Sequence, residues 1–382
     1  MTRPVLVDLF SGCGGFGLGG ELSGFHSVVA VDIDTTLQSA YKLNFPQTHT
    51  VTGDLSVMDE NTWKLLLKDT KVDGVIGGPP CQGYSRIGRC DLKDERRTLL
   101  HHFFRTVNII KPKFFIMENV EGLMDKKNRP ELDKVMSMID DRYTCLKPMI
   151  VDASKFGAPT KRKRVIVIGY DPSWMQAITE EDFIVPEIAV TVKDAISDLP
   201  KPISQTKDKT DYGWAHYETN KNLSVYAKKM RTVPAGKIGW PKAKNKLRLK
   251  IGDKKTSGHF ITVHAQRVSK RYSETKPGMI DKVSRSKKLE WDGLCPTLRA
   301  GTGSDKGSHQ AVRPLHPDYG RVITVREAAR LQGFPDWFCF HPTKWHSFRM
   351  IGNSVSPIVS EHLLSVVKVK LQEIIAKKAA SL

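Results

Sequence analysis

Residues 4–20 have the sequence PVLVDLFSGCGGFGLGG, in which a short β-rich run leads directly into a turn crowded with glycine. Glycine has no Cβ atom, so the backbone can turn tightly there and approach a ligand closely. A strand followed by such a turn is typical of nucleotide-binding α/β folds, although dehydrogenases and many ordinary loops share it. The stretch therefore favours a nucleotide-binding sheet and leaves the nucleotide open.

The alternation of β-rich and helical segments continues to about residue 170. The clearest strands are expected at Val5–Leu9, Val28–Asp32, Val72–Ile76, Phe114–Glu118 and Val165–Gly169, and helical spacing of apolar residues occurs at Thr36–Phe45, Arg96–Ile110 and Glu131–Asp140. This repetition predicts an α/β fold with a doubly wound, mostly parallel sheet. Ligands of such sheets bind at the carboxyl ends of the strands.

The pattern changes after about residue 185, where short, weakly periodic pieces rich in Gly, Pro, Lys and Trp predict a smaller, loop-rich domain. Helical spacing returns from Thr324, and Val355–Ile375 is expected to form a last long helix. We therefore expect a first domain at residues 1–185, a second at 186–349, and a C-terminal helix within 350–382 that returns to the first domain.

Positive charge is concentrated in the second domain. The chain has a formal net charge of +19, and residues 201–320 contain 26 Lys or Arg but 10 Asp or Glu. Clustered cations favour a phosphate backbone as partner, because binding releases counterions. A solvated basic surface is the alternative, and charge alone does not distinguish DNA from RNA.

Other sequence features exclude several classes of protein. No apolar run is long enough to span a bilayer, and the first ten residues lack a secretory signal, so we expect an intracellular protein without a membrane partner. The six cysteines form no Cys-x-x-Cys pair, which argues against a metal site or a disulfide framework. Any cysteine with a chemical role should act as a thiol.

Acidic residues follow two of the expected strands. Asp32 closes the run Val28–Val31 and is suited to accept the hydroxyls of a ribose, while Asp54, in Thr52-Gly53-Asp54, is suited to accept from an adenine amino group. Together with the glycine-rich turn, they would place three loops around one nucleoside. The alternative is that both acids are only helix caps.

A more specific motif, Gly77-Gly78-Pro79-Pro80-Cys81-Gln82-Gly83-Tyr84-Ser85, follows another strand. Proline stiffens this loop and would hold the Cys81 thiol in a fixed direction. A buried cysteine is usually a small apolar residue, but its place on the ligand side of the sheet favours a catalytic thiol. Glu118-Asn119-Val120 ends a neighbouring strand and adds a carboxylate, for which the alternative is a structural acid or cap.

Together these residues resemble the cytosine-C5 DNA methyltransferases of the bacterial restriction-modification type, in the family's order and over nearly the whole chain. Residues 157–164, GAPTKRKR, resemble the family's GVPQxRxR, with Thr160 in place of the usual Gln. Residues 321–335, RVITVREAARLQGFP, and 351–355, IGNSV, resemble its last two motifs. The departure at Thr160 puts the supporting role of the Gln in doubt.

The resemblance implies a Rossmann-like methyltransferase that uses S-adenosyl-L-methionine and a target-recognition domain for double-stranded DNA. It would methylate carbon 5 of a cytosine flipped out of a specific sequence, through a Cys81 adduct at carbon 6. The implied catalytic residues are Cys81, Glu118, Arg162 and Arg164, with Asn119 and Gln82 in support. The implied cofactor contacts are Phe10, Ser11, Gly12, Cys13, Gly14, Gly15, Asp32, Ile33, Asp54, Leu55, Pro79, Asn353 and Ser354.

The resemblance also implies the setting in which the chain acts. We expect a monomer without a metal, located in the cytoplasm at the nucleoid of a prokaryote or in the nucleus of a eukaryote. It would protect host DNA from a separately acting restriction endonuclease, or act as an orphan methyltransferase. Specificity for a recognition sequence is expected to reside in the variable segment at residues 185–320.

Four other functions fit the sequence less well. A tRNA cytosine-C5 methyltransferase would share the motifs, but the basic segment between Tyr170 and Arg321 is longer than a small structured RNA requires. A non-catalytic DNA-binding protein would not need the catalytic set. An amino-directed methyltransferase would have Asp or Asn before Pro-Pro and an aromatic residue after it, where this chain has Gly78 and Cys81. A dehydrogenase explains the first motif only.

Overall fold

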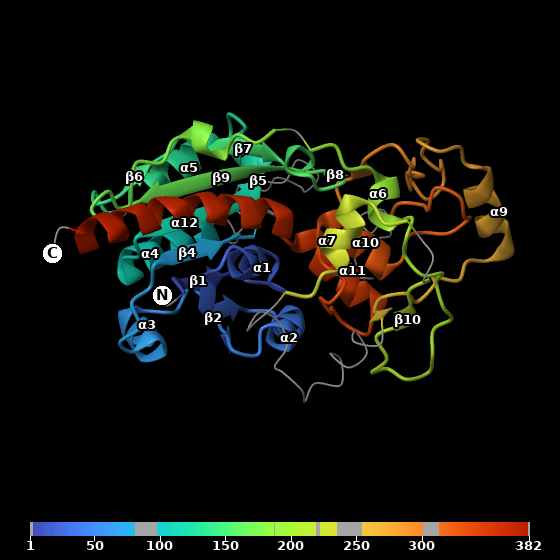
Figure 1. The fold of residues 1–382 in the computed structure, drawn as a ribbon, viewed down its shortest axis with the longest axis horizontal. Coiled ribbons are helices and arrows are strands. Elements are labelled where there is room, and N and C mark those ends of the chain that lie inside the picture. Colours follow the sequence, from blue (N-terminus) through green and yellow to red (C-terminus); the bar gives the residue numbers. More distant parts are fainter. Residues whose placement is uncertain are drawn as a thin grey trace.

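A mixed β-sheet with helices on both faces forms the first half of the chain in the computed structural model (Figure 1). The structure describes residues 3–80, 98–186, 188–218, 222–234, 254–300 and 313–380. The order of the strands across the sheet is β3-β2-β1-β4-β5-β9-β6, and β7 also pairs with β9. Their bounds are β1 Val5–Leu9, β2 His26–Asp32, β3 His49–Thr52, β4 Gly74–Gly77, β5 Phe114–Val120, β6 Thr144–Cys145, β7 Met149–Asp152 and β9 Lys163–Tyr170.

The sheet is parallel from β3 to β5 and antiparallel beyond it. Strands β3, β2, β1, β4 and β5 all run the same way, whereas β9 is antiparallel to β5, and β6 and β7 are antiparallel to β9. The chain moves outward from β1 through β2 to β3 and then returns to β4 on the other side of β1. The prediction of a doubly wound, mostly parallel sheet is confirmed, and the topological switch point lies between β1 and β4.

Alternating side chains of the strands build a core on each face of the sheet. In β1, Leu6 belongs to one buried cluster and Val7 to the other, as the two-residue period of a strand requires. One cluster is covered by α1 Gly15–Leu22, α2 Thr35–Asn44 and α12 Pro357–Ala380, and the other by α3 Glu60–Leu67, α4 Leu99–Ile110 and α5 Arg129–Met136. Burial on both faces explains the nearly continuous apolar runs in these strands.

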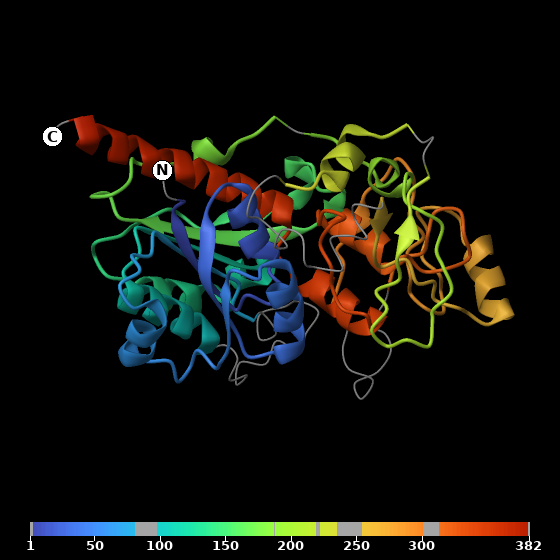
Figure 2. The ribbon, with the colours of Figure 1, turned by 60° about the horizontal axis from the view of Figure 1, so that its bottom comes forward.

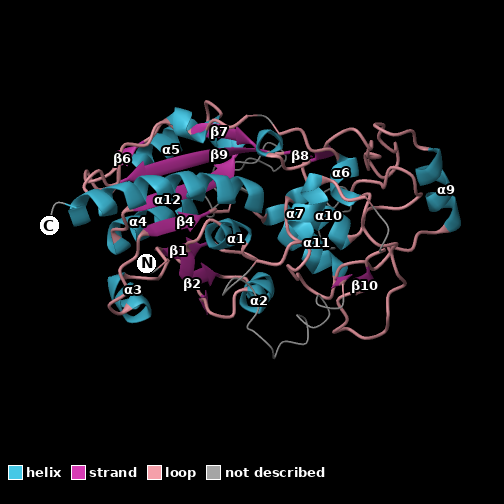
Figure 3. Ribbon diagram, in the orientation of Figure 1, coloured by secondary structure: helices cyan, strands magenta, loops and turns pink. Residues whose placement is uncertain are grey.

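The second half of the chain is loop-rich, as expected (Figures 2 and 3). Its helices are α6 Val192–Ile196, α7 Val225–Arg231, α9 Gln266–Glu274, α10 Val325–Gln332 and α11 Lys344–Asn353. Its short strands are β10 Ala215–His216, β11 Lys255–Thr256 and β12 Cys295–Pro296, and the short elements left to name in the first half are η2 Glu121–Met124, η3 Ala153–Phe156, β8 Thr160–Lys161 and η4 Glu180–Phe183. Within the described ranges, no helix is both long and apolar enough to cross a membrane.

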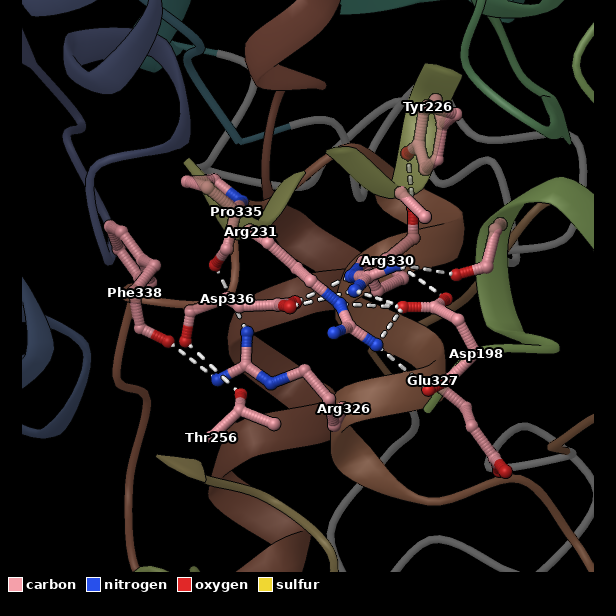
Figure 4. A network of polar contacts seen from close by, with 12 residues as sticks. Asp198, Tyr226, Arg231, Thr256, Arg326, Glu327, Arg330, Pro335, Asp336 and Phe338 are labelled. Atoms are coloured by element: carbon pink, nitrogen blue, oxygen red, sulfur yellow. Dashed lines mark hydrogen bonds and ion pairs between the residues drawn. The ribbon is translucent and has the colours of Figure 1, made fainter. Parts of the chain in front are cut away.

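A network of buried charges organises this half around α10 (Figure 4). Arg330, which is fully buried, forms ion pairs with Asp198 after α6 and with Asp336 after α10. Arg326 donates to the backbone oxygens of Ser257, Pro335 and Phe338. A buried guanidinium is tolerated only when its donors are used in this way. Both arginines of the VREAARLQGFP motif therefore hold the fold together.

The two halves are also joined directly. Asn44 of α2 donates to the backbone oxygen of Cys339 and accepts from its backbone N–H, and Arg349 of α11 forms an ion pair with Asp34. The domain boundary predicted at residue 349 falls within α11. The end of this helix therefore lies against the sheet half, where it contributes to the site described below.

The contact between α1 and α12 leaves no room for a side chain at Gly19. A Cβ atom there would lie 2.0 Å from Ser360 Oγ and 2.4 Å from the backbone N of Glu361. We expect Gly19→Ala to lower the free energy of unfolding by about 1–3 kcal/mol, because α12 must move away. The loss should occur although alanine is favoured over glycine within helices by about 1 kcal/mol.

Denaturant titration of the wild type and Gly19→Ala measures this difference. Gly53→Ala is the control for stability, because its added methyl group would meet other atoms only at 3.5 Å or more. A Gly19→Ala variant as stable as the wild type would contradict the close packing of α1 against α12.

Candidate active site

A cavity of about 630 Å³ lies at the carboxyl ends of the central strands. Its walls come from the loops after β1, β2, β3 and β4, from the end of β5, and from the end of α11. The predicted residues that line it are Phe10, Ser11, Gly12, Cys13, Gly15, Asp32, Ile33, Asp54, Leu55, Pro79, Glu118, Arg162, Arg164, Asn353 and Ser354. Since the loops after β1 and β4 are among them, the cavity spans the topological switch point.

The glycine-rich turn is fixed to the neighbouring strand by Asp32. The carboxylate of Asp32 accepts from the backbone N–H groups of Gly12 and Asp34, both at 2.8 Å. Gly12 and Gly14 have φ values of 55° and 96°, in the left-handed region that favours glycine. These hydrogen bonds position the turn, and the remaining lone pairs of Asp32 can still accept from a ligand.

The two strand-end acids are not the caps of the helices that follow them. Asp34 caps α2 and Asp59 caps α3, whereas Asp54 accepts from the backbone N–H of Ser56 at 2.8 Å. This hydrogen bond holds the pKa of Asp54 below its usual range. Burial raises the pKa of Asp32. Adjacent strands place Asp32 and Asp54 on one wall of the cavity, where a nucleoside can meet both.

Asp8 is a third acid of this wall, which sequence analysis did not single out. Its side chain is almost fully buried and borders the cavity, and its Oδ2 accepts from the Tyr41 hydroxyl at 3.2 Å. Its Oδ1 has no hydrogen-bond partner among the described residues. Burial raises the pKa of Asp8 to about 8. The sequence feature that could have identified Asp8 is its position at the end of a predicted strand.

The opposite wall carries the catalytic candidates. Glu118, near the end of β5, forms an ion pair with Arg164 of β9, with Arg164 Nε 2.8 Å from Glu118 Oε1. The pairing of β5 with β9 places these residues two positions apart on neighbouring strands. A Cβ atom at Gly78 would lie 3.2 Å from Glu118 Oε2, so glycine lets the loop after β4 pass close to the carboxylate.

Asn119 holds the loop that leads to the predicted nucleophile. Its side-chain amide donates to the backbone oxygen of Pro79 at 3.3 Å, and its side-chain oxygen accepts from the backbone N–H of Val120. The side chain therefore connects the end of β5 to the loop after β4. Cys81 and Gln82 themselves lie outside the described residues.

Arg162 and Arg164 have different surroundings. Arg162 is buried, and its guanidinium donates to the backbone oxygens of Leu298, Gly352 and Ser354. Thr160, which replaces the family's Gln, is also buried, and its Oγ1 has no partner among the described residues. Residues 160–163 are alternately buried and exposed in the structure, a pattern that the sequence TKRK does not reveal.

Of the other residues predicted to contact the cofactor, some line the cavity and one does not. Cys13 is buried 3.2 Å from Ser354 Oγ, and burial raises the pKa of its thiol to about 12, so it stays neutral. Gly14 does not line the cavity and packs against Tyr41 and Phe45. Lining residues that sequence analysis missed are Phe16, Asp34, Leu37, Gly53, Ser56, Gly78, Pro80, Thr98, Leu99, Val120, Arg349, Met350, Gly352 and Val355, besides Asp8.

Comparison with known proteins identifies similar chains. The model of the family described as C-5 cytosine-specific DNA methylase matches residues 5–368. The type II methyltransferase M.XorII of Xanthomonas oryzae pv. oryzae is 39% identical, over 94% of this chain and 83% of its own length. M.DdeI of Desulfomicrobium norvegicum is 29% identical, over 94% and 87%.

Solved structures have the same fold. An E. coli structure, described as a DNA modification methyltransferase encoded within a prophage, has a TM-score of 0.83 and 39% identity over 97% of this chain and 100% of that chain. The S. pombe Dnmt2 methyltransferase has a TM-score of 0.57 at 15% identity, over 97% and 99%. At that identity the second likeness concerns the fold alone.

The contacts of Arg162 predict a structural loss that Arg164 should not share. We expect Arg162→Met to lower the free energy of unfolding by at least about 2 kcal/mol, because three buried carbonyls lose their donor. Arg164→Met removes one ion pair at the cavity wall and should cost less. Denaturant titrations without ligand measure both, and equal losses would contradict the difference in surroundings.

Proposed function

The chain belongs to the C-5 cytosine-specific DNA methylase family, and from this premise we propose that it methylates a cytosine flipped out of double-stranded DNA, with Cys81 as covalent nucleophile. It is a DNA cytosine-5-methyltransferase of the type II restriction-modification kind. The mechanism is supported chiefly by one observation. Glu118, Arg164 and the loop leading to Cys81 lie in the same cavity as the glycine-rich turn and its acids.

Carbon 5 of cytosine is too weak a nucleophile to take a methyl group unaided. A thiolate of Cys81 adds to carbon 6, and the electrons of the 5,6 double bond become available at carbon 5. After carbon 5 has gained the methyl group, loss of its proton expels the thiolate and restores the double bond. The covalent step thus divides one difficult displacement into addition, transfer and elimination.

Glu118 is placed to hold the cytosine during these steps. Its carboxyl group would bind the N3 and amino edge of the base and stabilise the charge that develops as the adduct forms. Arg164 keeps this carboxyl group oriented through their ion pair. Arg162 supports the same wall through its three backbone contacts.

The position of Glu118 also favours base flipping. Its side chain is mostly buried in the cavity wall, at the end of a strand in the middle of the sheet. A cytosine stacked within a duplex could not bring its edge to this carboxyl group. The base must therefore rotate out of the DNA helix, as target bases of DNA methyltransferases generally do.

The other wall of the cavity fits S-adenosyl-L-methionine, which supplies an electrophilic methyl group when bound. Asp32 would accept the ribose hydroxyls, and Asp54 would accept from the adenine amino group. Ile33, whose side chain is largely exposed, offers an apolar surface beside Asp32. Within the described ranges Asp8 Oδ1 has no hydrogen-bond partner, and the backbone of the glycine-rich turn is close by, which is consistent with a polar ligand in contact with this wall.

Recognition of a specific sequence is assigned to residues 186–349. The basic charge in this region suits a phosphate backbone, and its loops offer side chains for contacts with bases. We propose that the protein acts as a monomer on host DNA in the cytoplasm. A separate restriction endonuclease would cut the same sequence where it is unmethylated.

Cys81→Ala should abolish methyl transfer and leave the binding of DNA and cofactor largely intact, because the thiol forms the adduct and does not build the described walls. A covalent complex with DNA that carries 5-fluorocytosine at the target should form only when Cys81 is present. Cys145→Ala, in β6 and away from the cavity, is the control. Methyl transfer by Cys81→Ala at the wild-type rate would refute the mechanism.

Exchanging residues 185–320 for the corresponding part of a relative with another target should transfer the target preference. Arg164 and Arg321 would remain in their own surroundings, and the chemistry would stay with the first domain. Bisulfite sequencing of DNA from cells that express the wild type or the chimera identifies each methylated sequence. A chimera that keeps the original target would place recognition elsewhere.

A further inference from the structure

The loop after β3 forms the cavity wall that has the least support from the sheet. Gly53, Asp54, Leu55 and Ser56 line the cavity, but β3 is the edge strand and pairs only with β2 in the described sheet. The loop therefore has the end of a neighbouring strand on one side only. Connecting segments of this kind need other contacts to keep a fixed position.

Arg105 of α4 supplies these contacts. Its Nη2 donates to the backbone oxygens of Leu55 and Met58, and its Nη1 donates to that of Ser56 at 3.1 Å. The guanidinium is planar and rigid, so three carbonyls that meet one such group are fixed relative to one another. In the described part of the chain Arg105 forms no ion pair, and its hydrogen bonds all go to this loop.

The contact extends to the acid that faces the ligand. Ser56, whose carbonyl accepts from Arg105, donates its own backbone N–H to Asp54 Oδ1. Arg105 thus controls the peptide segment that orients the Asp54 carboxylate. The side chains of Leu55 and Met58 are buried in the same apolar cluster as Phe104 of α4, which fixes the loop from below.

The helix that carries Arg105 also borders the cavity at its other end. Thr98 and Leu99, at the start of α4, line the cavity, and Leu99 is six residues before Arg105, or about 9 Å along the helix axis. Residues 81–97, which lie outside the described part, precede α4 directly in the sequence. One rigid helix therefore connects the chain that follows Cys81 with the loop of Asp54.

We propose that Arg105 is a positioning residue for the purine half of the cofactor, which it serves by fixing the loop that carries Asp54. The inference rests on the proposed function, because it takes Asp54 as the acceptor for the adenine amino group. Arg105 would touch neither cofactor nor DNA. Its loss should therefore change the recognition of the purine and leave the chemical step and the binding of DNA nearly unchanged.

Calorimetric titration with S-adenosylhomocysteine and S-inosylhomocysteine tests the proposal, since the second compound has oxygen in place of the purine amino group. The wild type should bind the adenosyl compound at least about tenfold more tightly, because Asp54 loses its donor in the other. Arg105→Met should weaken the binding of the adenosyl compound by about tenfold or more and reduce the preference to below about threefold. Arg105→Lys keeps the positive charge but lacks the planar guanidinium with its several donors. Its preference for the adenosyl compound should lie between those of the wild type and Arg105→Met.

Two further measurements separate this role from a general loss of structure. Steady-state kinetics of Arg105→Met should show a raised KM for S-adenosylmethionine, with kcat and the Kd for DNA within about threefold of the wild type. Arg129→Met is the matched control, since Arg129 pairs with Asp133 on α5 and does not line the cavity. This control should keep the wild-type preference and KM.

The outcomes distinguish a failure of the role proposed for Asp54 from a failure of the role proposed for Arg105. A wild type that binds both compounds equally would overturn the role of Asp54 and, with it, the proposal for Arg105. A discriminating wild type whose Arg105→Met and Arg105→Lys variants discriminate equally well would overturn the proposal alone. If Arg105→Met does not fold, Arg105→Lys carries the test, and an unchanged preference in that variant would overturn the proposal.

Discussion

The position of β1 in the sheet is the constraint on which the rest of the structure depends. Because β1 is parallel to both of its neighbours, β2 and β4, the loops that follow all three strands leave the sheet at the same edge. Successive strands are added on one side of β1 up to β3 and on its other side from β4 onward. The loops on the two sides therefore diverge and leave the cavity between them. The hydrogen bond from Gly12 to Asp32 then fixes the loop after β1 to the end of β2. Without the hydrogen bond to Asp32, the glycine-rich turn would not present a fixed surface to a ligand.

Arginine side chains hold segments of this arrangement together in two ways, whether buried, as Arg330 and Arg162 are, or half-buried, as Arg105 is. Arg330 forms ion pairs with carboxylates, whereas Arg162 and Arg105 donate hydrogen bonds to backbone oxygens. These two kinds of contact have different consequences. An ion pair fixes two side chains, but a guanidinium that binds several carbonyls fixes the course of a main chain. Arg162 does this for the segment around Leu298 and for the segment at the end of α11. Loops that contribute single residues to the cavity can thereby be held as firmly as strands.

Much of the sheet could be predicted because its strands are apolar on both faces. The five predicted strands occur within two residues of their expected bounds, whereas β3, with the sequence HTVT, is short, mostly polar and at the edge, so no pattern marked it. Motifs indicated which loops line the cavity, since the residues that end strands are adjacent in sequence to the strands themselves. Arg105 and Arg349 were missed because their importance comes from contacts between distant elements, whereas Asp8 was missed although its place at the end of a predicted strand was a signal. The resemblance implied one catalytic role for Arg162 and Arg164, but alternate residues of an extended segment face different surroundings, and Arg162 faces the interior.

The order of the strands also separates charges that would otherwise conflict. A DNA phosphate backbone is repelled by carboxylates, whereas a cofactor with a positive sulfonium group is attracted to them. Asp32 ends β2 and Asp54 follows β3, on one side of the switch point, while Arg164 lies on β9 and Glu118 on β5, on the other side. Asp8 of β1 is not counted among these charges, because burial raises its pKa to about 8. The acids of the first group are therefore held at the far side of the cavity from the arginine that meets Glu118. In the proposed mechanism Glu118 is the acid that approaches the DNA base, and its Oε1 is paired with Arg164 Nε at 2.8 Å. This pairing would reduce the repulsion that an isolated carboxylate exerts on a DNA strand, and it leaves a neutral pair whose remaining oxygen could accept from the base in the proposed mechanism.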